Sequence, residues 1–219
     1  MSGPTPEHSC HENKSMKEIE PKPSLRISHI VYGRTAENGR VKYLVDSLGR
    51  GEERAIPEEV VLRRWRRRRF PGFVFSGERL SSTLWRALPV LLGPQPKTWS
   101  TLDLASLRTL REPKSKDLRD RHLVVPSPET MSALFLVCGP RRLEALIDRH
   151  GRPERSGRSG VPDLFLFARG THGRPSIARF VEVKKPEEPV SRDQLDEIEF
   201  LQGLGLHARV LRLIEREQR

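Results

Sequence analysis

The sequence predicts an α/β fold in which a small mixed sheet is flanked by helices. Two apolar runs with strand character, residues 163–168 and 177–184, are separated by turn-forming residues. A helical pattern follows over residues 191–203, and a last run over 207–213 is apolar at alternate positions. This strand–strand–helix–strand order is the expected core of the fold.

The first two strands are expected to form a hairpin. Gly170, Gly173 and Pro175 lie between them and favour a turn. A hairpin centred on this turn pairs Asp163 with Glu182. Side chains alternate between the faces of a strand, so Glu182 and Lys184 point the same way and Val183 points into the core. Three ionisable side chains then meet at one end of an apolar hairpin.

These residue types suit phosphodiester hydrolysis. The carboxylates of Asp163 and Glu182 are hard oxygen ligands of the kind that Mg²⁺ or Mn²⁺ prefers, and the backbone carbonyl of Val183 offers another oxygen. Lys184 would neutralise the phosphate or help to position the attacking water. The alternative is that Glu182 and Lys184 are solvated neighbours and that Asp163 belongs to a turn. We favour a site, because charges buried beside apolar strands need compensation.

The N-terminal part of the chain is expected to begin with a disordered polar tail, residues 1–23. Residues 25–46 read as a hairpin around the turn signal at residues 37–39. Residues 49–56 are expected to be a loop. A helix then begins near Pro57, with Glu58 and Glu59 in its first turn.

This helix is expected to run through residues 63–69, which contain six arginines. Contact with DNA phosphates is the functional interpretation, and its candidate residues are Arg66, Arg67, Arg68 and Arg69. A solvated helix end or a nuclear targeting run are the alternatives. An aromatic loop ending in Glu78 follows, and then a helix over residues 80–88 that Pro89 should end.

Residues 90–128 are expected to form a variable insert with a helix over 99–110 and a surface loop over 112–121. Residues 127–150 then predict two helices separated by a break at Gly139 and Pro140. Further along, Ser191 and Gln194 have the spacing of a capping box at the start of the helix over residues 191–203.

Composition limits the choice of partners. The 219 residues include 40 Lys and Arg against 29 Asp and Glu, which leaves a net charge of +11 and favours nucleic acid, although ribosomal or membrane-surface partners fit the charge equally well. Cys10 and Cys138 do not suggest a disulfide framework. Without a long apolar run or a signal-like N-terminus, we expect an intracellular protein without a membrane partner, nuclear in a eukaryote and otherwise cytoplasmic.

The motifs of the hairpin resemble those of the PD-(D/E)xK nuclease superfamily, with Pro162-Asp163 and Glu182-Val183-Lys184 in its pattern. The wider sequence, from Arg158-Ser-Gly160 through Lys185-Pro186 to Ser191-x-x-Gln194, is similar to a VRR-NUC domain over residues 155–213. The resemblance implies a restriction-endonuclease-like core. It also implies that Gln194 lies at the rim of the active site, where it would contact DNA.

The order of the elements before residue 90 is similar to that leading into the nuclease domain of the Fanconi-associated nuclease family. This wider resemblance covers residues 25–213. It implies that Glu78 is an additional metal ligand on a helix packed beside the hairpin. Pro89 and Lys185 depart from the pattern of that family, and most of its large N-terminal part is absent.

The predicted function is Mg²⁺- or Mn²⁺-dependent hydrolysis of DNA by a domain spanning residues 24–214, followed by a charged tail at 215–219. The resemblance implies 5′-flap endonuclease and 5′–3′ exonuclease activity that leaves a 5′-phosphate, and a role in interstrand crosslink repair. A homodimeric Holliday-junction resolvase and a catalytically inactive DNA-binding relative are the alternatives. Monomer and homodimer both stay open.

Overall fold

A computed structural model describes residues 27–37, 40–46, 52–151, 160–171 and 173–215. The predicted N-terminal tail, the turn residues 38–39 and residues 216–219 of the predicted C-terminal tail lie outside the described residues. Within the described ranges, none of the helices combines the length and the apolar character needed to cross a membrane.

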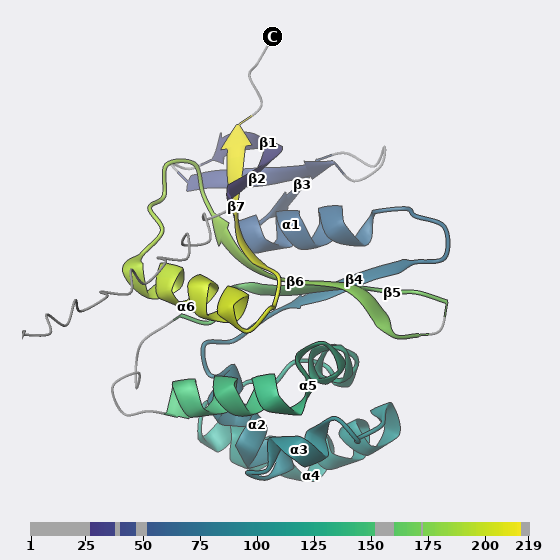
Figure 1. Ribbon diagram of the computed structural model, residues 1–219. Helices are drawn as coiled ribbons and strands as arrows, with labels where there is room; N and C mark the ends of the chain where they lie inside the picture. Colours follow the sequence, from purple (N-terminus) through teal and green to yellow (C-terminus); the bar gives the residue numbers. More distant parts are fainter. Residues whose placement is uncertain (1–26, 38–39, 47–51, 152–159, 172, 216–219) are drawn as a thin grey trace, which may run out of the picture.

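The centre of the fold is a seven-stranded mixed sheet with the strand order β3-β2-β1-β7-β6-β5-β4 (Figure 1). Strand β7 pairs in parallel with both β1 and β6, and the other neighbours are antiparallel. The mixed sheet is as predicted but larger than expected. Its strands are β1 (Ile27–Glu37), β2 (Arg40–Asp46), β3 (Glu52–Ala55), β4 (Val74–Arg79), β5 (Leu164–Arg169), β6 (Pro175–Lys184) and β7 (Ala208–Glu215).

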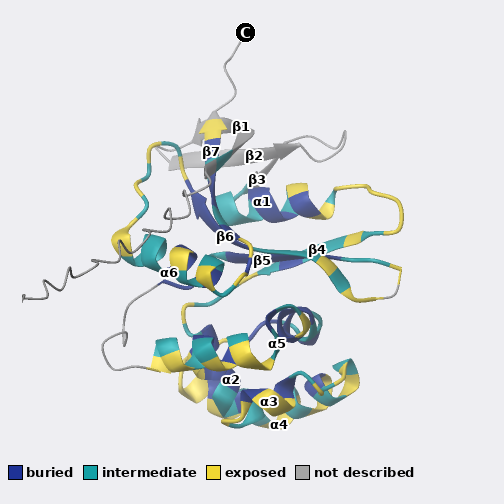
Figure 2. Ribbon diagram, viewed as in Figure 1, coloured by how far each residue is buried: buried dark blue, intermediate teal, exposed yellow. Residues whose placement is uncertain are grey.

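Helices cover both faces of the sheet, which creates two apolar cores (Figures 1 and 2). Helix α1 packs on one face against apolar side chains of β5, β6 and β7. The other face is covered by the helices of the insert and by the helix between β6 and β7. The helices are α1 (Pro57–Arg66), α2 (Leu84–Leu92), α3 (Pro96–Trp99), α4 (Leu104–Asp120), α5 (Pro128–Gly151) and α6 (Arg192–Gly203).

The predicted hairpin is confirmed as β5 and β6. Leu164 pairs with Val181 and Phe165 with Phe180, so the same register places Asp163 opposite Glu182. Leu164 and Val181 pack toward α1, whereas Phe165 and Phe180 belong to the core on the opposite face. The alternation of side chains therefore assigns each residue of the hairpin to one face of the sheet.

Two strands occur where loops were expected, so these predictions were wrong. Residues 52–55 form β3, which pairs antiparallel with β2. The aromatic segment before Glu78 contains β4, which pairs antiparallel with β5. Gly77 permits this close pairing, because a Cβ there would lie 2.9 Å from the carbonyl oxygen of Phe165. Partners distant in the sequence, rather than local pattern, make these segments extended.

The prediction that Pro89 ends its helix was also wrong, because α2 continues to Leu92. Pro89 removes only the hydrogen bond to the carbonyl of Trp85. The additional turn buries Leu91 completely. Lys114 also donates hydrogen bonds from Nζ to the carbonyl oxygens of Val90 and Leu91, at 3.3 and 2.7 Å. Burial and this side-chain cap offset the lost hydrogen bond.

The loop predicted over residues 112–121 is instead the second half of α4. Pro113 lies inside this helix and has no N–H to donate to the carbonyl of Thr109. Thr109 is exposed to water. Asp103 caps the helix by accepting a hydrogen bond from the backbone N–H of Ser106.

The helix start at Pro57 and the helix break at Gly139 are both confirmed. Gly139 has a φ of 65°, which divides α5 into two helical halves that lie at an angle. The helix that begins at Pro57 ends at Arg66. Of the last three arginines of the basic run, Arg67 is the C-cap of this helix, and Arg68 and Arg69 follow it outside the helix.

Candidate active site

Asp163 lies immediately before β5 and is held by both neighbouring strands. Its backbone carbonyl accepts a hydrogen bond from Leu80 N–H at 2.8 Å, beyond the end of β4. Its carboxylate oxygen Oδ2 accepts the backbone N–H of Val183 on β6 at 2.7 Å. Asp163 is therefore fixed at the end of the hairpin opposite to the turn, as the sequence predicted.

Glu182 and Lys184 are on the same side of β6 and are almost completely buried, at 3% and 4% exposure. Lys184 Nζ lies 3.1 Å from Glu182 Oε1 and 3.3 Å from Glu188 Oε1. The second oxygen of Glu188 accepts the backbone N–H of Lys185 at 3.1 Å. The ammonium group is thus held between two carboxylates, one of which comes from the connector after β6.

Gln194 in the first turn of α6 joins the helix start to this cluster. The capping box is confirmed, because Ser191 Oγ accepts the N–H of Gln194 and Gln194 Oε1 accepts the N–H of Ser191. The other end of the same carboxamide, Nε2, donates a hydrogen bond to Glu182 Oε1. One side chain therefore caps α6 and orients a candidate metal ligand.

The local electrostatics oppose the ionisation of both carboxyl groups. Burial and then the nearby charge of Asp163 raise the pKa of Glu182 to about 7. Burial also raises the pKa of Asp163, although the hydrogen bond from Val183 partly offsets this effect. The pKa of Lys184 is lowered by burial, but Glu182 and Glu188 outweigh that and raise it overall. A cation close to both carboxylates would favour their charged forms.

The residues present fit a magnesium-type ion. Mg²⁺ is commonly held by one or two carboxylates and keeps several water ligands. Asp163 and Glu182 supply two carboxylates, and the carbonyl of Val183 is the backbone oxygen predicted from the sequence as a further ligand. No group of three His, Cys, Asp or Glu side chains is placed to hold one ion among the residues that the structure describes. Water would therefore complete the coordination.

Comparison with known families matches residues 105–213 to the VRR-NUC domain. The match includes Asp163, Glu182, Lys184 and Gln194. The chain contains a VRR-NUC domain. The predicted resemblance to this nuclease family is thus confirmed, together with the α/β fold of the PD-(D/E)xK type.

Two solved structures share the fold of this chain. They are crystal structures of paFAN1 bound to 5′-flap DNA with a gap, with flaps of 1 and 2 nucleotides. Their TM-scores are 0.55 and 0.52, each at 17% identity, and the alignments cover 90% and 91% of this chain. This chain spans 39% of the length of each of them. No curated protein matches the sequence significantly.

Glu78 is not on a helix, which corrects the expectation from the sequence. It lies in β4 and pairs with Phe165 of β5. Its carboxylate accepts hydrogen bonds from the backbone N–H and the hydroxyl of Ser127, just before α5. The structure therefore joins Glu78 to Ser127. The role of Glu78 as a further metal ligand stays a prediction.

The basic run of α1 lies at the opposite end of that helix from the carboxylates. Glu58, in the first turn, is close enough to Asp163 for its charge to raise the pKa of that group. A helix of ten residues is about 15 Å long, which separates this end from Arg66. Arg66 donates a hydrogen bond from Nη2 to the carbonyl of Gly77 at 2.7 Å, and Arg68 lies over the ring of Trp65.

Glu188 was not predicted from the sequence as part of the site, although a local signal was present. Glu188 lies between two prolines, in the connector that directly follows the motif lysine. Glu187 has a φ of 61°, a turn conformation that brings Glu188 back toward Lys184. A rigid acidic connector after a buried lysine is a pattern that indicates such a contact.

Proposed function

We propose that this VRR-NUC domain is a divalent-metal-dependent nuclease that hydrolyses DNA phosphodiester bonds. The observation that carries the proposal is the convergence of Asp163, Glu182 and Lys184 at one end of the β5–β6 hairpin. Glu182 and Lys184 are almost completely buried there, and Asp163 is partly buried and accepts the backbone N–H of Val183. This combination suits both a metal ion and a phosphate.

Asp163 and Glu182 would hold Mg²⁺ or Mn²⁺, with the carbonyl of Val183 as a further ligand. When bound, such an ion polarises the phosphate and lowers the pKa of its water. Gln194 fixes the orientation of Glu182 by its hydrogen bond. Lys184 carries the positive charge that the phosphate or the attacking water needs, and Glu188 keeps the ammonium group in place.

The proposed substrate is branched DNA, with a 5′ flap as the first candidate, in a repair role such as interstrand crosslink repair. In the two similar structures, paFAN1 is bound to 5′-flap DNA. The net charge of +11 and the run from Arg66 to Arg69 also suit a polyanion. The expected products carry a 5′-phosphate and a 3′-hydroxyl.

The test is the cleavage of labelled DNA by the purified protein. The substrates are a 5′-flap duplex and a four-way junction, each with Mg²⁺, with Mn²⁺ and with EDTA. Asp163→Ala and Lys184→Ala are compared with Asp120→Ala and Lys185→Ala, which change exposed residues of the same types. Circular dichroism verifies that each variant is folded.

We expect metal-dependent cleavage that is lost in the first two variants and retained in their controls. Preference for the flap supports the flap nuclease, whereas preference for the four-way junction by a dimer supports the resolvase alternative. DNA binding without metal-dependent cleavage would overturn the nuclease and leave a DNA-binding relative of the fold.

A further inference from the structure

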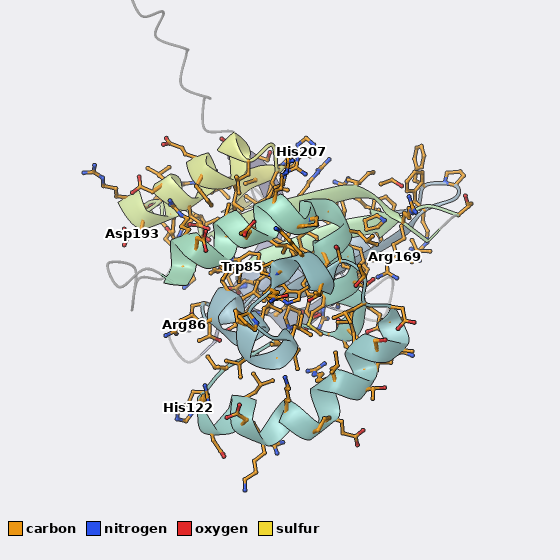
Figure 3. All side chains as sticks on the ribbon, turned by 60° about the horizontal axis from the view of Figure 1, so that its bottom comes forward. Trp85, Arg86, His122, Arg169, Asp193 and His207 are labelled. Carbon is orange, nitrogen blue, oxygen red and sulfur yellow. The ribbon has the colours of Figure 1, made fainter. Side chains whose placement is uncertain are left out.

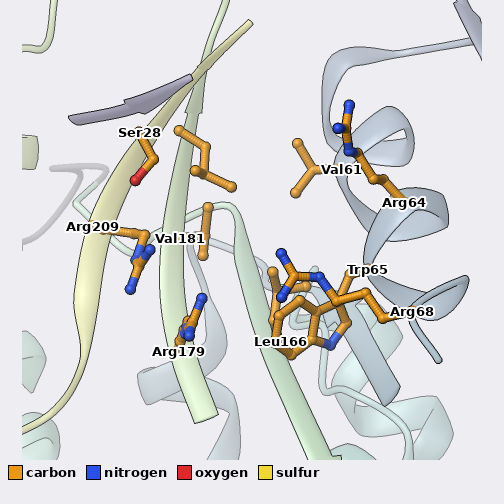
Figure 4. Close-up of a pocket in the computed structure, with 10 residues that line it drawn as sticks. Ser28, Val61, Arg64, Trp65, Arg68, Leu166, Arg179, Val181 and Arg209 are labelled. Atoms are coloured by element: carbon orange, nitrogen blue, oxygen red, sulfur yellow. The ribbon is translucent and has the colours of Figure 1, made fainter. Parts of the chain in front are cut away.

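A hollow of about 260 Å³ lies between α1 and the strands β6 and β7 (Figure 4). Arg179 and Val181 of β6 line it on the α1 face of the sheet. Glu182 and Lys184 occupy alternate positions and point to the other face. The hollow and the candidate active site are thus on opposite faces of the same strand.

The lining of the hollow is strongly basic. It includes four arginines and no acidic residue among the described residues that form it. In Figure 4, the guanidinium groups of Arg68, Arg179 and Arg209 turn toward the same space, with the hydroxyl of Ser28 at its edge. Arg64 lies one turn before Arg68 on the outer side of α1.

Trp65 holds two of these guanidinium groups in place. The guanidinium carbon of Arg68 lies 4.8 Å from the ring centroid, and that of Arg179 lies 5.5 Å from it. Trp65 is itself fixed, because its indole N–H donates to the carbonyls of Ser76 and Phe167 at 2.8 and 3.1 Å. The arginines are therefore positioned before any ligand arrives.

The arginines of the hollow repel one another. Burial first, and then the charges of Arg209 and Arg68, lower the pKa of Arg179. Neither Arg68 nor Arg179 forms an ion pair with a carboxylate in the part of the chain that the structure describes. An anion in the hollow would offset this repulsion.

We propose that the hollow between α1 and β6–β7 is a second anion site that binds a phosphate group. Guanidinium groups present several N–H donors in a fixed plane and pair with phosphate oxygens by two parallel hydrogen bonds. The volume is below the roughly 300 Å³ at which pockets for complete small-molecule ligands begin, so it suits a single phosphate group. Because the sheet separates it from Glu182, this phosphate is not the one being cleaved.

Binding of inorganic phosphate tests the site without any catalysis. The protein is titrated with phosphate in EDTA, at constant ionic strength maintained with chloride, and binding is followed by NMR and by the thermal unfolding midpoint. Arg68→Gln and Arg179→Gln are compared with Arg86→Gln, which changes an exposed arginine on α2, on the other side of the sheet from α1 (Figures 1 and 3). Arg68 is exposed, so its substitution leaves the core unchanged.

We expect phosphate to bind the metal-free protein, and its affinity to fall roughly tenfold in each of the two hollow variants but not in Arg86→Gln. Asp163→Ala should bind phosphate as the unchanged protein does, which separates this site from the proposed nuclease site. Absence of phosphate binding, or equal affinity in Arg68→Gln and Arg86→Gln, would overturn the proposal.

The source of the phosphate is decided with DNA in the non-cleaving Asp163→Ala background. If adding Arg68→Gln or Arg179→Gln weakens duplex binding more than Arg86→Gln does, and inorganic phosphate competes with the duplex, the phosphate belongs to a nucleic acid strand. If only phosphate binding is weakened, the phosphate belongs to a free phosphorylated molecule. Either result supports the site and assigns its ligand.

Discussion

The carboxylate of Glu78 accepts hydrogen bonds from the backbone N–H and the hydroxyl of Ser127, which is 49 residues later in the chain. The backbone N–H of Ser127 lies 2.9 Å from Oε2, and its hydroxyl oxygen lies 2.6 Å from the same atom. The hydroxyl also accepts the N–H of Thr130 at 3.3 Å, at the start of α5. This contact ties the edge strand β4 to the N-terminus of α5, where a negative charge is favourable.

Two substitutions separate the anchoring role of Glu78 from a role as metal ligand. Ser127→Ala removes one hydrogen bond to the carboxylate and a helix cap, and it should cost about 1–2 kcal/mol of unfolding free energy with little effect on cleavage. Glu78→Gln should reduce metal-dependent cleavage at least tenfold if the carboxylate binds the ion. Urea unfolding and flap cleavage are measured on both variants.

Glu129→Gln is the matched control. Glu129 lies in the first turn of α5, two residues after Ser127, and pairs with Arg108 at the surface. It should leave cleavage unchanged. Equal cleavage by Glu78→Gln and the unchanged protein would assign Glu78 to anchoring alone.

The two roles of Gln194 are separated in the same way. Gln194→Glu keeps the capping box, because Glu occupies the same position in that motif, but it replaces the donor to Glu182 by a negative charge. We expect a free energy of unfolding within about 1 kcal/mol of the original and a clear loss of cleavage. The measurements are denaturant unfolding and initial cleavage rates at saturating Mg²⁺.

Ser191→Ala provides the complementary variant, because it removes the cap and leaves the Gln194–Glu182 contact. It should lower stability by about 1 kcal/mol and retain cleavage. If both variants lose cleavage in proportion to their lost stability, the contact with Glu182 has no separate function.

Glu197 makes the stability of the fold depend on pH. It is fully buried in α6, 2.8 Å from Arg149 Nε and 2.9 Å from His150 Nε2. Burial by itself would raise its pKa, but His150 and Arg149 outweigh burial and lower the pKa below the ordinary value of 4.5. The resulting stabilisation is complete above that value and is lost as pH falls through the lowered pKa.

Glu197→Gln should therefore cost roughly 3 kcal/mol at pH 7, because it leaves Arg149 partly buried without its charged partner. The difference from the unchanged protein should shrink as pH falls below 4. Urea unfolding from pH 7 to pH 3 measures it, with the exposed Glu199→Gln as control. A difference that is constant over this range would contradict the assignment.

Gly77 is required for the pairing of β4 with β5. A Cβ at this position would lie 2.8 Å from Leu166 Cδ2 and 2.9 Å from the carbonyl oxygen of Phe165. Gly77→Ala should cost about 1–3 kcal/mol by overpacking, and it should also displace the neighbouring Glu78. Thermal unfolding tests the first effect and metal-dependent cleavage the second.

Gly203→Ala is the control for this prediction. A Cβ at Gly203 meets no heavy atom of the described residues within 4 Å, and Ala is the better helix former at the end of α6. The variant should be as stable as the original or slightly more stable. An equally small effect of Gly77→Ala would show that β4 can shift without cost.

Much of the candidate site could be predicted because its determinants are local. The turn between β5 and β6 sets the register, and strand alternation then places Glu182 and Lys184 on one face. The capping box of Ser191 and Gln194 can also be recognised from four consecutive residues of the sequence. The structure adds that Gln194 reaches Glu182, a contact that depends on how α6 packs against β6.

The sequence by itself determined the mixed α/β core, the hairpin with its three ionisable residues, and the basic character of the chain. The tertiary structure decided the rest, including the strand that contains Glu78, the continuation of α2 beyond Pro89 and the position of the arginines. These features depend on partners that are distant in the sequence, such as β5 for β4 and Lys114 for the end of α2. A local pattern carries no information about such partners, because their burial and hydrogen bonds arise only when the chain folds.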